Sequence, residues 1–92
     1  MREDDRWKVL IEELEGSERE WRLTQVTAAG PERAGAVGLA EQMARTYVPR
    51  HPWSPRRRHL YRVGEGTWLV EVEGATRDFH FRVTLAEYVE TI

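Results

Sequence analysis

The sequence predicts an α+β domain in which one main helix packs on an antiparallel sheet, with the elements in the order ββαβββ. Three observations predict it. Five short segments alternate apolar and polar residues, one segment between 31 and 48 repeats apolar residues every three or four positions, and glycine- or proline-containing stretches separate these segments. A chain of 92 residues, 40% of them hydrophobic, has room for one core, so residues 1–92 form a single domain.

The first two strands are expected at about 6–14 and 19–27, joined by a hairpin loop. We expect Trp21 to lie opposite Ile11 and Leu23 opposite Val9, because the apolar faces of the two strands then coincide. Leu10 and Leu14 point to the other face of this hairpin. Apolar residues on both faces indicate a central strand, or a strand whose outer face is covered by something else.

The helix is expected to start near Pro31 and to end at about Val48, where Pro49 stops it. Gly35 and Gly38 disfavour its first turns, so the start can also lie near 36. One apolar stripe follows the helical spacing and should face the sheet: Ala36, Leu39, Ala40, Met43 and Tyr47.

The last three strands are expected at about 57–63, 67–73 and 78–85, as a meander with glycine-containing turns. The expected pairing places Tyr61 opposite Val70, and Val70 opposite Phe81, so that one face is apolar across all three strands. Residues 85–92 either prolong the last strand or form a short C-terminal helix.

Composition excludes several classes of function. The chain has no cysteine, which removes disulfides and thiolate chemistry. The expected register sends His59 and His80 to opposite faces, so we predict no metal site, and no motif indicates a catalytic residue or a cofactor. The acidic first residues and the lack of a long apolar run predict a cytoplasmic protein without a membrane segment. Arginine makes up 13 of the 14 basic residues, which is typical of a GC-rich bacterial genome.

Charge is distributed unevenly along the chain. Residues 45–62 carry six basic and no acidic residues, whereas the segments on either side each have a net charge of −4. Aromatic residues lie within this basic block, and two prolines stiffen its loop. The residues predicted to bind a partner are therefore Arg50, His51, Trp53, Arg56, Arg57 and Arg58.

Two functions fit this basic and aromatic loop. The first is a non-enzymatic protein-interaction module that docks an acidic protein, or the acidic surface of a second copy of the chain, with Trp53 as the anchor. The alternative is binding of RNA or single-stranded DNA through phosphate contacts and base stacking. The many acidic residues outside the block favour the first function.

Overall fold

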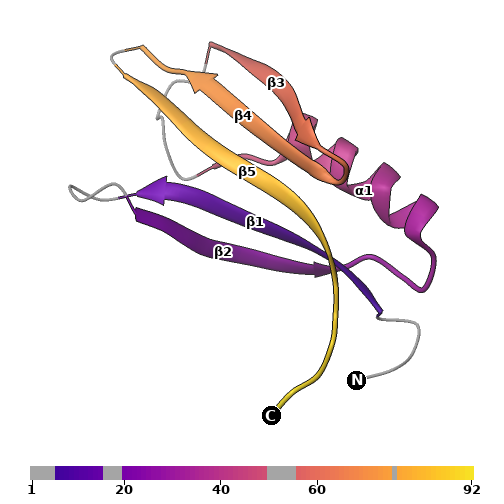
Figure 1. Cartoon of the computed structure of the whole chain (residues 1–92). Coiled ribbons are helices and arrows are strands. Elements are labelled where there is room, and N and C mark those ends of the chain that lie inside the picture. Colours follow the sequence, from indigo (N-terminus) through magenta and orange to yellow (C-terminus); the bar gives the residue numbers. More distant parts are fainter. Residues whose placement is uncertain (1–5, 16–19, 50–55, 76) are drawn as a thin grey trace.

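A five-stranded antiparallel sheet carries one helix on one of its faces (Figure 1). The computed structural model describes residues 6–15, 20–49, 56–75 and 77–92. In chain order the elements are β1 (Trp7–Glu15), β2 (Glu20–Ala28), α1 (Arg33–Thr46), β3 (Arg57–Gly64), β4 (Thr67–Glu73) and β5 (Asp78–Glu87). The strands lie in the order β2-β1-β5-β4-β3, with every neighbouring pair antiparallel. The predicted α+β class and ββαβββ order are confirmed.

The core lies between α1 and the sheet. Three alanines spaced four residues apart, Ala36, Ala40 and Ala44, are fully buried on the helix. Their small side chains let the helix approach closely, and mainly β5 and β1 pack against it. The buried side chains that the sheet contributes are Val9, Ile11, Trp68, Val70, Val72, Phe81 and Val83. The predicted stripe is confirmed in part, since Leu39, Met43 and Tyr47 pack at the border of this core.

One acidic side chain is buried in the same layer. Glu13 on β1 is only 6% exposed, and the hydroxyl of Tyr47 donates a hydrogen bond to its Oε2 at 2.5 Å. The Tyr47 ring also packs against Phe81, with 5.1 Å between the ring centroids. A buried carboxylate needs such donors, because an unsatisfied one would cost several kcal/mol. Tyr47 therefore ties the end of α1 to the β1 side of the sheet.

The predicted pairing of β4 with β5 is confirmed, but that of β1 with β2 is wrong. Trp21 lies opposite Leu14 instead of Ile11, and Leu23 lies opposite Glu12 instead of Val9. A bulge in β2 places one extra residue between the partners of Ile11 and Glu12. Trp21 and Leu23 consequently lie on the face away from α1, together with Leu10 and Leu14.

The predicted pairing of β3 with β4 is wrong by one residue. Leu60, not Tyr61, lies opposite Val70, and a second irregularity follows at the end of β3, between Arg62 and Gly64. His59 lies opposite Glu71, which in turn lies opposite His80. The two histidines therefore share one face, which corrects the expectation that they lie on opposite faces.

At the C-terminal end, the chain prolongs the last strand and does not form the alternative short helix. β5 continues to Glu87, and residues 88–92 are neither helix nor strand. Figure 1 shows this tail leaving the body of the domain beside the first described residues, where the Tyr88 N–H donates to the Arg6 carbonyl. Within the described ranges, the structure has no helix with the length and apolar character that a membrane span requires.

Candidate functional site

The sheet face away from α1, here called the open face, is not covered by any described element. In an antiparallel sheet such a solvent face is ordinarily polar. Here Leu23 is 58% exposed and Val26 is 53% exposed, and half-buried apolar side chains lie next to them on β1 and β2. We call this group the apolar stripe: Leu10, Leu14, Trp21, Leu23 and Val26.

The open face also carries charged side chains that are bound to one another across neighbouring strands. Arg82 donates to both carboxylate oxygens of Glu12, at 2.8 and 3.3 Å. Its guanidinium also lies 4.4 Å from the centre of the Trp21 ring, a cation–π contact. Further along, Nε2 of His80 lies 3.7 Å from Oε2 of Glu71. These pairs join neighbouring strands, so the apolar stripe is bordered by polar side chains that bind one another.

Glu73 on β4 also lies on the open face, where it accepts hydrogen bonds from β3 side chains. It binds His59, and Arg57 donates to it from 2.9 Å. The hydrogen bond with His59, and then the one from Arg57, hold the pKa of the Glu73 carboxyl below its ordinary value. Glu73 therefore stays ionised at neutral pH and does not serve as a proton donor there.

The structure places only part of the predicted basic loop. Arg50, His51 and Trp53 lie outside the described residues. Arg56 is exposed, and its backbone N–H donates to the Glu73 carbonyl at 2.7 Å. Arg57 pairs with Glu73 on the open face. Arg58 points to the other face, where it donates to the Ala44 carbonyl at 3.1 Å and lies 5.7 Å from the Phe81 ring centre. The three described arginines are therefore not brought together as one patch.

Sequence reasoning missed Trp21, Leu23 and Val26 as surface residues. It did place Leu10 and Leu14 on the face away from Ile11, and this apolarity on both faces was the signal that pointed to the open face.

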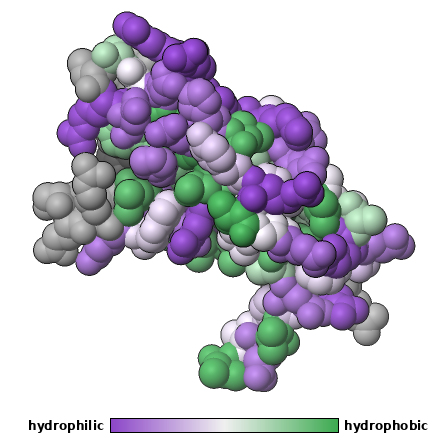
Figure 2. Space-filling view, turned by 45° about the horizontal axis from the view of Figure 1, so that its top comes forward, coloured by the Kyte–Doolittle hydropathy of each residue, from purple (hydrophilic) through white to green (hydrophobic). Residues whose placement is uncertain are grey.

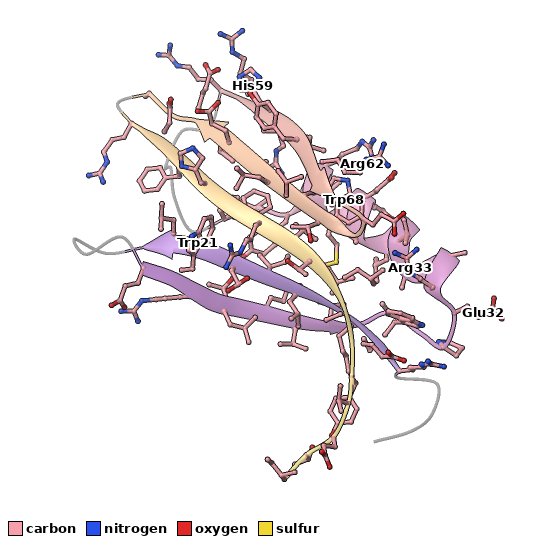
Figure 3. The ribbon with its side chains drawn as sticks, viewed as in Figure 1. Trp21, Glu32, Arg33, His59, Arg62 and Trp68 are labelled. Atoms are coloured by element: carbon pink, nitrogen blue, oxygen red, sulfur yellow. The ribbon has the colours of Figure 1, made fainter. Side chains whose placement is uncertain are left out.

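Figure 2 shows hydrophobic groups in green between purple hydrophilic side chains in the middle of the molecule. Figure 3 places Trp21 at the β1–β2 side of the sheet and His59 on β3 at the opposite side.

Comparison with known proteins adds no functional assignment. No protein-family model, no curated protein and no solved structure matches the chain. The part of the chain that the structure describes also contains no group of three or more histidine, aspartate and glutamate side chains arranged to hold a metal ion. The open face is thus defined by its apolar stripe and its internal ion pairs.

Proposed function

We propose that this domain is a non-enzymatic protein-interaction module that associates with a second copy of itself through the open face. The observation that supports the proposal is the apolar stripe, which leaves Leu23 and Val26 more than half exposed on a surface that no described element covers. Large apolar patches on a soluble domain typically mark interaction sites. Two sheets that pack face to face would bury this stripe as the two layers of a sandwich do.

The size of the open face supports a dimer. Five strands spaced about 4.8 Å apart, with about nine residues each, span roughly 24 by 30 Å. This corresponds to roughly 700 Å² for each copy, close to the roughly 800 Å² that each partner contributes to an interface of standard size. The open face is therefore large enough for a specific contact between copies.

Charge also favours a second copy over an acidic protein on this face. Its basic residues, Lys8, Arg57 and Arg82, nearly balance its acidic ones, Glu12, Glu71, Glu73 and Asp78. Arg57 and Arg82 already bind Glu73 and Glu12. A nearly neutral face does not repel its own copy, whereas attraction of an acidic partner needs a surplus of positive charge.

The basic loop is a second surface through which we propose that the domain binds a partner. Docking of an acidic protein through Arg50, Trp53 and Arg56 needs none of the apolar stripe, so the two contacts can be separated by mutation. Nucleic-acid binding has less support, because Arg57 and Arg58 are engaged within the chain. It is kept as an outcome of the experiment below.

The experiment is sedimentation equilibrium of the chain at concentrations up to about 500 µM, a range that detects even a weak dimer. We expect the wild-type chain to be a dimer at the upper end. Val26→Lys should shift the molecule to a monomer, because two charges would face the partner's apolar stripe. Val48→Lys is the matched control, since Val48 is a 77% exposed valine just after α1.

Four outcomes distinguish self-association through the open face from the other functions. A monomeric wild-type chain over the whole range, or a dimer that survives Val26→Lys, rejects the open face as the self-association surface. Loss of a co-purified protein on Trp53→Ala with Arg56→Glu, but not on Val26→Lys, assigns the interaction to the loop. Salt-sensitive binding of a fluorescent RNA or single-stranded DNA by a monomeric chain supports the nucleic-acid function instead.

A further inference from the structure

A hollow of about 600 Å³ lies between the first turns of α1 and the β3–β4 hairpin. It is on the helix side of the sheet, so it is separate from the open face. Figure 3 shows Arg33, Arg62 and Trp68 at this end of the sheet, away from Trp21 and His59. The residues that line it are Arg33, Val37, Arg62, Val63, Gly64, Glu65, Gly66 and Trp68. Its volume is in the range of sites that bind small organic molecules.

Trp68 lines the hollow with an unused hydrogen-bond donor. Trp68 is 5% exposed, and no described residue accepts a hydrogen bond from its indole N–H. Every described side-chain nitrogen or oxygen that is fully buried has a hydrogen-bond partner. The N–H of Trp68 therefore keeps some access to solvent, and Trp68 is one of the residues that line the hollow. A buried tryptophan N–H ordinarily has an acceptor, and here a ligand can supply one.

Two guanidinium groups stand at the rim of the same hollow. Arg62 lies directly across from Trp68 on the neighbouring strand and has no acidic partner among the described residues. Arg33 has only Glu65 near it within the described part of the chain, at 4.0 Å, with the Glu65 side chain 95% exposed. Guanidinium groups bind carboxylates through paired N–H donors. The rim thus offers an excess of positive charge to an anion.

Part of the wall of the hollow is apolar, and one of its edges is a tight hairpin turn. Val37 and Val63 add aliphatic surface next to the Trp68 ring. Gly66 has φ of +79°, and a Cβ there would lie 3.2 Å from Leu85 Cβ, so the hairpin turn needs a glycine. The Leu85 N–H donates to the Gly66 carbonyl at 2.7 Å and holds the turn against β5. This turn at the border of the hollow is therefore held in place before a ligand binds, which lowers the entropy lost on binding.

We propose that this hollow binds a small aromatic carboxylate. The carboxylate lies between Arg33 and Arg62, and the flat ring lies against Val37 and Val63, next to Trp68. The indole N–H donates to an acceptor atom of the ligand. This binding site goes beyond self-association and uses none of the residues of the apolar stripe.

The experiment titrates the ¹⁵N-labelled chain with 2-naphthoate and follows the indole N–H resonance of Trp68. We expect a saturable shift below about 1 mM ligand. Arg33→Gln and Arg62→Gln should each weaken binding about tenfold, and the double variant about 100-fold, because each removes charge-assisted hydrogen bonds to the carboxylate. Both arginines are exposed, so these variants should keep the wild-type amide spectrum elsewhere.

Controls separate this site from other effects. Arg45→Gln changes an exposed arginine near the other end of α1 and should bind 2-naphthoate like the wild type. Val26→Lys should also bind normally, so failure of the dimer does not remove the ligand site. The proposal is overturned if the Trp68 resonance does not move, if uncharged 2-naphthamide binds as well as 2-naphthoate, or if inorganic phosphate binds equally well.

Discussion

At the scale of single residues, Glu73 shows how the open face is held together. It accepts hydrogen bonds from β3 side chains, and these keep the pKa of its carboxyl below the ordinary value, first through His59 and then through Arg57. In the unfolded chain the carboxyl has its ordinary pKa. The folded protein therefore gains stability from this ionised carboxyl above the unfolded pKa, and it loses that gain as pH falls through the folded pKa.

Glu73→Gln should remove this acid-dependent part of the stability. We expect the wild-type chain to lose more free energy of unfolding than Glu73→Gln between about pH 5 and pH 2, where carboxyl groups titrate. Urea unfolding at a series of pH values measures the difference. Glu90→Gln, which changes an exposed carboxyl in the C-terminal tail, should behave like the wild type. Parallel curves for the wild type and Glu73→Gln would show that Glu73 has no special role.

At the scale of elements, the sequence predicted the strands and the helix to within a few residues, but it did not predict the register wherever a strand is irregular. A single extra residue reverses the face of every side chain beyond it, and alternation alone does not locate such a residue. In β3 both alternate sets contain apolar residues, since Leu60 competes with Tyr61 and Val63. The structure selects Leu60, and Arg58 then reaches the Ala44 carbonyl at the end of α1.

The packing of the helix was also predicted only in part, because small residues contribute to it. Ala44 is fully buried, yet its side chain contributes little to an apolar pattern, so the predicted stripe did not include it. Because the alanines set the spacing between α1 and the sheet, Ala40→Leu should overpack the core and lower the free energy of unfolding by about 1–3 kcal/mol. Ala34→Leu, at an exposed position of the first turn, should change it little. Chemical denaturation of both variants measures this, and equal effects would contradict the close approach of the helix.

At the scale of the whole molecule, one helix covers one face of a five-stranded sheet, and no other described element covers the opposite face. The sequence predicted the buried apolar face correctly for β4 and β5, but not for β3. It could not predict where the open face gathers its apolar side chains, because the bulge in β2 decides which of its side chains reach that face, and β2 and β5 come to lie on either side of β1 only after folding. The contact of Arg82 with both Glu12 and Trp21 joins these three strands and has no counterpart in sequence spacing.

The two faces of β4 give the sharpest check of this arrangement. Val70 is fully buried under α1, whereas its neighbour Leu69 lies on the open face with Arg82 directly across. Val70→Asp should unfold the domain, because a buried unpaired carboxylate costs several kcal/mol against a total stability of about 5–15 kcal/mol. Leu69→Asp should leave a cooperative thermal transition, because water and the Arg82 guanidinium both reach the new carboxylate. Circular dichroism during heating distinguishes the two variants, and a folded Val70→Asp chain or an unfolded Leu69→Asp chain would reverse the assignment of the faces.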